Sequence, residues 1–125
     1  MSDPTAEFFA GLGRRGHEPL LEGVTGTIRF DLEHEHGIDR WFVLIDQGDL
    51  HVSREEREAG CVWRTSRTLF DRFASGEQYV YAAWARNALR VEGDVVLGYV
   101  FLRVLPGPPD AHHPRAFAGE GSRSA

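Results

Sequence analysis

The sequence predicts an α+β fold: a five-stranded, mostly antiparallel sheet with helices packed on one face. Five short segments have the composition or the apolar–polar alternation of strands with a buried face. Tight polar turns join the first three of these segments, and strands joined in this way run antiparallel. The helical segments lie before and after these strands instead of alternating with each strand, so a parallel doubly wound sheet is not expected.

The first half of the chain is expected to form a helical segment and three strands. A short helix begins near Pro4, is interrupted by the glycines of residues 11–16, and is followed by a helical turn ending near Gly23. Apolar and polar residues alternate over residues 27–33, which predicts a half-buried strand. Two further strands follow after polar turns, over residues 40–46 and 50–53.

The second half is expected to contain two strands and three helices. Thr65 or Ser66 caps a helix whose end is marked by Gly76, at the usual place of a C-terminal cap glycine. Asp94 caps the final helix. The other elements are a strand over 61–65, a helix over 78–86, a strand over 89–93 and the final helix over 95–105. We predict a single domain over residues 1–106 and a tail rich in Pro, Gly and Ser over residues 107–125.

The composition is that of a soluble globular protein of 125 residues, 42% hydrophobic and 26% charged. A net charge of −5 and the absence of lysine argue against nucleic acid as a partner and against polybasic membrane attachment. The longest apolar stretch, residues 95–102, is much shorter than the roughly 20 residues of a bilayer span. We therefore expect no transmembrane segment, no signal peptide and a cytoplasmic location.

The sequence contains no recognisable catalytic motif, so we predict no enzymatic activity, no cofactor and no metal. Residues 11–16 match the glycine pattern of dinucleotide-binding loops, but the strand that this pattern requires does not precede them. His34 and His36 lie in a polar turn without the further ligands of a zinc site. Cys61 has no cation near it in the sequence and is interpreted as a small buried hydrophobic residue.

The distribution of apolar residues points to something beyond an ordinary core. In the second strand Trp41 and Val43 face one side while Phe42 and Leu44 face the other, and the final helix is apolar around most of its circumference. For the strand, a covering partner or a crossing loop accounts for this pattern. For the final helix, a position deep in the core, a ligand cavity or a subunit interface does so. The sequence leaves these possibilities open.

Several short motifs follow one another in a characteristic order between residues 20 and 106. They are Gly-Thr-Ile-Arg-Phe at 26–30, the hairpin at 41–48, Cys-Val-Trp-Arg at 61–64, the run at 67–77, Ala-Ala at 82–83, and Leu-Arg-Val-Glu-Gly-Asp at 89–94 before an apolar helix. This set resembles the sterol carrier protein (sterol-binding) domain family, especially its short bacterial single-domain members. Two positions depart from the family pattern: Asn87 replaces a glycine, and Trp63 replaces a smaller aliphatic residue.

The resemblance implies a non-enzymatic domain in which sheet and helices enclose an apolar tunnel for a sterol, a fatty acid or an acyl-CoA. The final helix is then a wall or lid of the tunnel, and a tryptophan at position 63 is large enough to fill part of it. Strand alternation and helical spacing place ten residues around the cavity. They are Ile28, Phe30, Trp41, Val43, Trp63, Phe70, Phe73, Leu97, Phe101 and Leu102.

Two alternatives to lipid binding or transfer remain. In the first, the cavity is closed and the domain is an interaction module that forms a homodimer through Phe42 and Leu44. In the second, the domain is an accessory subunit for an enzyme that acts on an apolar intermediate.

Overall fold

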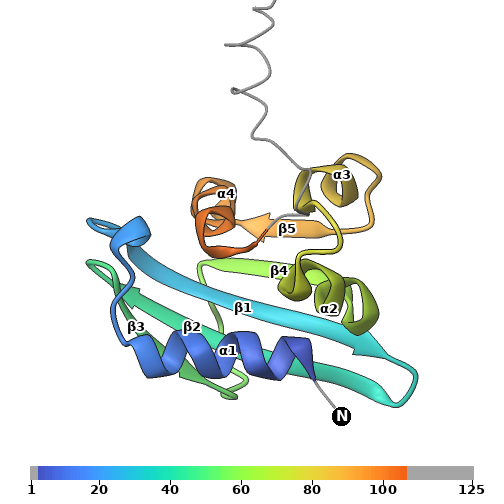
Figure 1. Cartoon of the computed structure of the whole chain (residues 1–125), viewed down its shortest axis with the longest axis horizontal. Coiled ribbons are helices and arrows are strands. Elements are labelled where there is room, and N and C mark those ends of the chain that lie inside the picture. Colours follow the sequence, from blue (N-terminus) through green and yellow to red (C-terminus); the bar gives the residue numbers. More distant parts are fainter. Residues whose placement is uncertain (1–2, 107–125) are drawn as a thin grey trace, which may run out of the picture.

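The computed structural model describes residues 3–106, which form a five-stranded sheet with helices on one face (Figure 1). The helices are α1 (Pro4–Arg15), α2 (Arg67–Ser75), α3 (Val80–Ala85) and α4 (Val95–Phe101), with 3₁₀ turns η1 (Pro19–Leu21) and η2 (Leu102–Val104). The strands are β1 (Thr25–His34), β2 (Gly37–Asp46), β3 (Asp49–Ser53), β4 (Cys61–Ser66) and β5 (Arg90–Gly93). The predicted fold class is confirmed.

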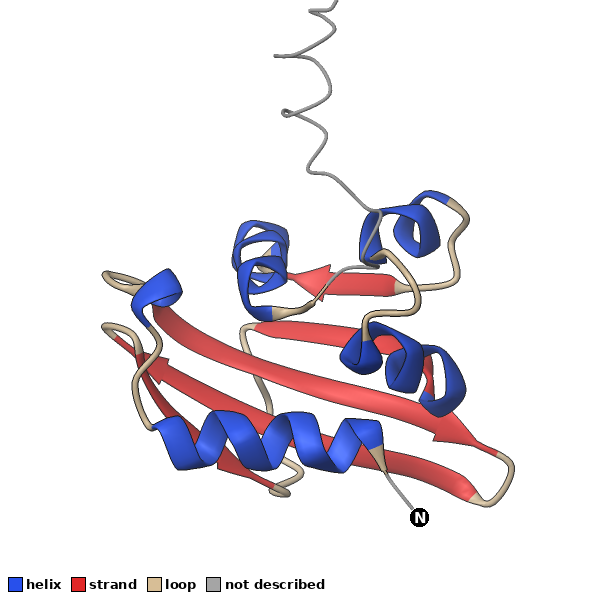
Figure 2. Cartoon of the chain, in the orientation of Figure 1, coloured by secondary structure: helices blue, strands red, loops and turns tan. Residues whose placement is uncertain are grey.

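The strand order is β3-β2-β1-β4-β5, and only the pairing of β1 with β4 is parallel. Phe30 in the central strand β1 lies opposite Trp41 of β2 and Trp63 of β4. Residues directly opposite one another in a ladder point to the same face, so this register brings three aromatic side chains together. Helices α1, α2 and α4 cover that face (Figure 2).

Helix α1 is longer than the sequence predicted. The carboxylate of Asp3 caps its first turn by accepting a hydrogen bond from the backbone N–H of Ala6, and Gly16 ends it with a left-handed φ of 69°. Gly11 and Gly13 therefore lie inside the helix and do not form the expected turn. Each glycine costs a helix about 1 kcal/mol, which the burial of the apolar face of α1 against the sheet outweighs.

The final helix is shorter than predicted, because α4 ends at Phe101 and the chain continues as the 3₁₀ turn η2. Its apolar circumference is divided between the interior and the surface. Leu97 and Phe101 are buried, whereas Val95, Val96 and Tyr99 are exposed, Val96 by as much as 72%. The core of the domain therefore buries only part of the apolar side chains of this helix.

Two glycines allow α4 to lie directly on the sheet. A Cβ atom on Gly98 would be 2.7 Å from Cγ1 of Val91 and 3.1 Å from both Sγ of Cys61 and Nε1 of Trp63. A Cβ atom on Gly26 of β1 would be 2.6 Å from Cδ2 of Leu97. Helix and sheet approach closely here because neither glycine has a side chain.

The opposite face of the sheet has a buried carboxylate at its centre. Asp31 is 1% exposed and accepts two hydrogen bonds from Arg29, at 2.9 and 3.1 Å. Arg40 of β2 and Arg64 of β4 approach the same carboxylate at 3.4 and 3.5 Å. The register explains the cluster, since Arg40 and Arg64 are the partners of Asp31 on its two sides.

This face corrects the prediction of a homodimer patch formed by Phe42 and Leu44. Phe42 is only 2% exposed, because the β3–β4 loop crosses it and places the Arg57 guanidinium 5.0 Å from the centre of its ring. Leu44 is 38% exposed. Of the explanations that the sequence left open for the apolar outer face of β2, the crossing loop is the one that the structure shows for Phe42.

In the part of the chain that the structure describes, no helix has the length and apolar character needed to cross a membrane. The positive φ of Asn87, 61°, agrees with its place in the family's pattern, where glycine is usual. The predicted tail, residues 107–125, lies outside the described residues.

Candidate functional site

The ten residues predicted to surround a cavity belong to one continuous core. Eight of them are buried, and Trp41 and Leu102 are half-buried at its edge. The set comes from β1, β2, β4, α2, α4 and η2, so the structure brings together residues from most of the chain. Whether any of them contacts a ligand stays a prediction.

Aromatic rings fill the centre of this core. Phe30 lies 5.3 Å from Trp63, 5.6 Å from Phe70 and 5.2 Å from Phe101, measured between ring centres. Phe9 of α1 stacks on Trp41 at 4.6 Å and on Phe70 at 5.5 Å. These separations are those of aromatic pairs in direct contact. We call Phe9, Phe30, Trp63, Phe70 and Phe101 the aromatic cluster.

Trp63 occupies the interior as its size suggested. It is 1% exposed and contacts Phe101 with a ring separation of 5.8 Å, between β4 and α4. Its Nε1–H group is buried without a hydrogen-bond partner among the described residues, which typically costs about 1–3 kcal/mol. The tryptophan therefore fills space between the sheet and the final helix, although its Nε1–H group lacks a hydrogen bond there.

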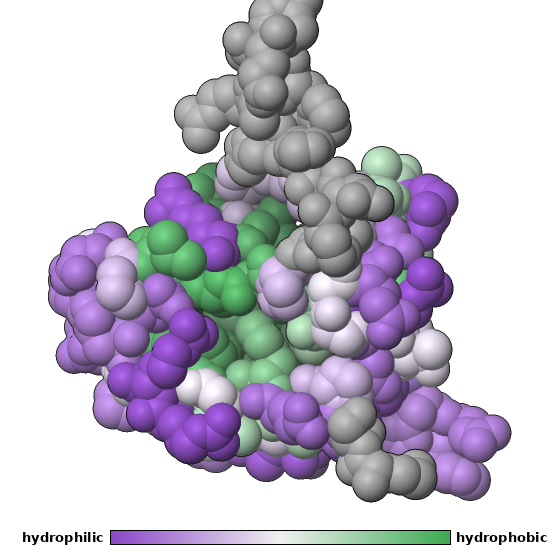
Figure 3. Space-filling view, in the orientation of Figure 1, coloured by the Kyte–Doolittle hydropathy of each residue, from purple (hydrophilic) through white to green (hydrophobic). Residues whose placement is uncertain are grey.

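An open groove of about 700 Å³ lies on the helix-covered face, outside the aromatic cluster. It is bounded by α1, the end of α2, and the segment from η2 to the end of the described chain. Its lining residues are Pro4, Glu7, Phe8, Gly11, Arg14, Arg15, Ala74, Ser75, Val104 and Pro106. Figure 3 shows the same face, hollowed between the helices, with apolar residues at the bottom of the hollow and hydrophilic residues around it.

Phe8 joins the groove to the aromatic cluster. Its ring lies 5.2 Å from Phe9, 6.0 Å from Phe70 and 6.3 Å from Phe101, and it is half-buried. One side of the ring therefore contacts the cluster while the other faces the groove. The groove has an apolar floor that continues into the core.

The charges of the groove are arranged along α1. Glu7 lies near the start of the helix, and Arg14 and Arg15 form its last turn. Arg15 is paired with the buried Glu18 at 2.8 Å. No ion pair joins Arg14 to another residue within 3–106, and its Nη2 atom lies 3.9 Å from the place of a Cβ on Gly11. The guanidinium of Arg14 is thus folded back over the groove with its charge unpaired by described residues.

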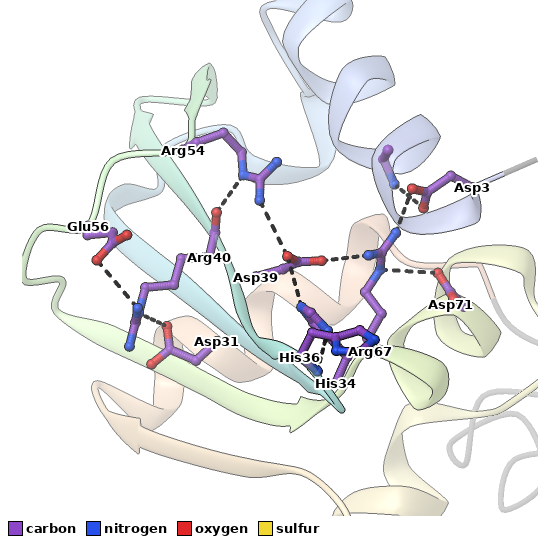
Figure 4. A network of polar contacts seen from close by, with 11 residues as sticks. Asp3, Asp31, His34, His36, Asp39, Arg40, Arg54, Glu56, Arg67 and Asp71 are labelled. Carbon is purple, nitrogen blue, oxygen red and sulfur yellow. Dashed lines mark hydrogen bonds and ion pairs between the residues drawn. The ribbon is translucent and has the colours of Figure 1, made fainter.

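An ion-pair network around Arg67 fixes the start of α1 beside α2 (Figure 4). Arg67 donates to Asp3, the N-cap of α1, and to Asp39 of β2. Asp71 lies 3.9 Å from Arg67 Nε and accepts a hydrogen bond from the Thr5 hydroxyl at 2.6 Å. Because α1 and the end of α2 both line the groove, this network contributes to the placement of its walls.

None of the ten predicted residues is among those that line the groove. The groove residues were missed because nothing in the local sequence marks them. Its width depends on Gly11 of α1 and Ala74 of α2, two small residues 63 positions apart. The pair Phe8–Phe9 was the available signal, since both residues are apolar but a helix turns adjacent side chains to different directions.

The other candidates from the sequence have no site around them. Cys61 is fully buried, and burial is the main reason that the pKa of its thiol is raised to about 11, with the Asp94 charge adding to the effect. His34 is the last residue of β1 and lies 3.3 Å from Asp39, and His36 lies in the exposed β1–β2 turn. Among residues 3–106 no group of three His, Cys, Asp or Glu residues is placed to hold a metal ion.

Comparison with known proteins gives a consistent result. The model of the SCP-2 sterol transfer family matches residues 9–105. No curated protein matches the chain in sequence.

Solved structures share the fold at low sequence identity. Palmitated SCP2L2 from Aedes aegypti is 15% identical with a TM-score of 0.67, over 89% of this chain and 96% of that chain. Sterol Carrier Protein-2 from Aedes aegypti, in complex with the C16 fatty acid palmitate, is 20% identical with a TM-score of 0.63, over 84% of this chain and 99% of that chain. The sec-alkylsulfatase Pisa1 from Pseudomonas sp. is 16% identical with a TM-score of 0.63, over 85% of this chain but 17% of that chain. The same fold therefore occurs both alone and as a small part of an enzyme.

Proposed function

The chain belongs to the SCP-2 sterol transfer family, and from this premise we propose that it binds a single-chain lipid in the groove above Phe8. The observation that carries the proposal is the combination of an apolar floor, continuous with the aromatic cluster, and an Arg14 guanidinium at one end that forms no ion pair within residues 3–106. The volume of about 700 Å³ lies within the range of small-molecule sites.

The acyl chain supplies most of the binding free energy in this proposal. Each methylene group moved from water to an apolar environment contributes about 0.8 kcal/mol. Burial of eight methylenes gives about 6 kcal/mol before the cost of immobilising the ligand is subtracted. Phe8 provides the floor, and Phe70 and Phe101, two of the ten predicted residues, lie directly behind it.

The head group is an anion such as a carboxylate. An arginine at the end of the groove forms charge-assisted hydrogen bonds with a carboxylate, and these are about twice as strong as neutral ones. A sterol, whose polar group is a neutral hydroxyl, gains less from Arg14. The proposal therefore favours a fatty acid or a related single-chain anion over a sterol.

The proposed role is carriage of the lipid without catalysis. The thiol of Cys61 is buried and its pKa is raised to about 11, and no histidine or cysteine is among the described residues that line the groove beside Glu7 and Ser75. The palmitate complex of Sterol Carrier Protein-2 from Aedes aegypti, which shares this fold, supports a fatty acid as ligand.

Titration with a fluorescent fatty acid, followed by displacement with palmitate, tests the proposal. Wild-type protein should bind the probe, and Phe8→Asp should weaken binding at least 10-fold because it places a charge on the apolar floor. Arg14→Gln should weaken palmitate binding by about 3–10-fold and should have less effect on a probe whose head group is uncharged.

Val96→Asp is the matched control, since it introduces the same charge at an exposed apolar residue outside the groove. Its affinity should equal that of the wild type. Absence of binding to the folded wild-type protein, together with absence of lipid in solvent extracts of gently purified protein, would contradict the proposed function. An equal loss in both aspartate variants would place the ligand elsewhere.

A further inference from the structure

The sheet has two edge strands, β3 and β5, which differ in how their outer edges are paired (Figure 1). At β3, the N–H of Leu50 donates to the carbonyl of Gly16 at 2.8 Å, so the segment after α1 occupies part of that edge. At β5, no segment within residues 3–106 forms backbone hydrogen bonds along the outer edge. A strand edge with unpaired backbone groups is a template for pairing with another chain.

The register between β4 and β5 shows which backbone groups of β5 are unpaired. Asp94 donates to the carbonyl of Gly60 at 2.7 Å just beyond the ladder, and hydrogen-bonded positions in an antiparallel pair recur at every second residue. Arg90 and Glu92 are therefore bonded to β4, whereas the N–H and C=O groups of Val91 point away from it. Neither group of Val91 has a hydrogen-bond partner in the described part of the chain.

The charges of β5 fit a second copy of the same strand. In an antiparallel pair centred on Val91, the two Val91 residues exchange both of their free backbone hydrogen bonds. Arg90 then lies opposite Glu92 of the partner subunit, and Glu92 lies opposite Arg90 of the partner subunit. Both side chains are accessible, since that of Arg90 is 71% exposed and that of Glu92 is 41% exposed. Opposite charges at directly opposed positions stabilise a strand pair.

Exposed apolar residues of α4 lie next to the same edge. Asp94 follows β5 directly and caps α4, whose Val95 and Val96 are 44% and 72% exposed. In an antiparallel pair the end of one strand lies beside the beginning of the other, so the first turn of α4 comes near Ala88 of the partner subunit. Ala88 is exposed in the single chain. Pairing therefore covers apolar side chains that the domain itself leaves exposed.

We propose that the outer edge of β5 binds a second copy of this chain and joins the two sheets edge to edge. A two-fold axis at Val91 makes the two halves of the interface identical, as in most homodimers. This surface is distinct from the patch of Phe42 and Leu44, where the β3–β4 loop covers Phe42. No residue of β5 or α4 is among those that line the groove, so the proposal does not depend on the proposed function.

Small-angle X-ray scattering over a concentration series measures the association of the full chain. The interface contains few residues and is expected to be weak. The scattering mass should be near 14.0 kDa at about 20 µM and should rise toward twice that value at about 500 µM. A wild-type mass that does not change over this range would overturn the proposal.

Charge variants test the pairing itself. Arg90→Glu and Glu92→Arg each place like charges opposite one another in both ion pairs, so either variant alone should associate about 10-fold more weakly. An equal mixture of the two variants should associate like the wild type, because every opposed pair in the mixed dimer again has opposite charges. Glu55→Arg in the exposed β3–β4 loop is the matched control and should associate like the wild type. Circular dichroism checks that each variant is folded. A mixture that stays monomeric, or a single variant that associates like the wild type, would overturn the proposal.

Amide hydrogen exchange measured by NMR identifies the edge that forms the interface. The N–H of Val91 should exchange more slowly as the protein concentration rises, because it gains an acceptor in the dimer. The N–H of Glu92, which is bonded to β4 in the monomer and in the dimer, is the internal control and should change much less. Association without this protection of Val91 would place the interface elsewhere and would also overturn the proposal.

Discussion

The two faces of the sheet are closed by different means. One face carries the aromatic cluster and is covered by α1, α2 and α4, whereas the other carries Asp31 and Phe42 beneath arginine side chains. Helices packed side by side on a sheet can leave a space between them, and the groove is such a space. On the outer face, arginine side chains surround Asp31 and cover the ring of Phe42, and long cationic side chains commonly cover apolar surface in this way.

This difference explains why an apolar groove lies on the face covered by helices. The outer face is apolar only at single positions: Phe42 is covered by Arg57, whereas Leu44 is partly exposed. The inner face is apolar at its centre, so a gap between the helices that cover this centre has an apolar floor. Measurements of stability should therefore show large effects of apolar contacts on the inner face and smaller effects of charge on the outer face.

The largest effect is expected for Phe30→Ala. Phe30 is fully buried and contacts every other ring of the aromatic cluster, so its removal should lower the free energy of unfolding by about 3–5 kcal/mol. Urea denaturation monitored by circular dichroism measures the change. Phe8→Ala, at a half-buried ring facing the groove, should cost clearly less. Equal losses at the two positions would contradict the distinction between cluster and groove.

An intermediate effect is expected for Asp31→Ala on the outer face. Three guanidinium groups lose their shared partner, and because they are 18–37% exposed, water compensates for part of the loss. We expect a loss of about 2 kcal/mol in urea denaturation. Glu92→Ala is the control, since Glu92 also pairs with Arg64 but is 41% exposed and should change stability by less than about 0.5 kcal/mol. A neutral Asp31→Ala variant would show that the arginines need no central carboxylate.

The smallest effect, at the end of the sheet, is dependent on pH. Protonated His17 donates from Nδ1 to Asp49 at 2.7 Å and from Nε2 to Glu22 at 3.3 Å, linking the segment after α1 to the β2–β3 turn. The hydrogen bond with Asp49, followed by that with Glu22, raises the pKa of His17 above its usual value of 6.5. The stabilisation is complete below pH 6.5 and is lost as the pH rises through the raised pKa.

Urea midpoints of the wild type and of His17→Gln at pH 6.0 and pH 8.5 test this effect. The wild type should be the more stable protein at pH 6.0, and the difference should shrink at pH 8.5. A difference that grows with pH would contradict the assigned role of His17.

Local sequence patterns determined much of the fold. Alternation placed Ile28, Phe30 and Trp63 on one face, and all three are buried there, because the side-chain direction in a strand is fixed by a period of two residues. The cap residues Ser66 and Gly76 bound α2 as predicted, since caps act through hydrogen bonds to the nearest backbone groups. The burial of Cys61 was also predicted from the sequence, whereas the left-handed backbone of Asn87 agrees with the family resemblance, in which a glycine stands at this position.

Tertiary packing alone decided the rest. Helix α1 continues through Gly11 and Gly13 because its apolar face is buried against the sheet, and Phe42 is covered because a distant loop places Arg57 over it. The groove depends on the placement of α1 beside α2, to which Arg67 contributes, and the small residues Gly11 and Ala74 are part of its lining. Residue periodicity specifies the direction of a side chain within its own element, but the space between two elements depends on contacts among residues far apart in the chain.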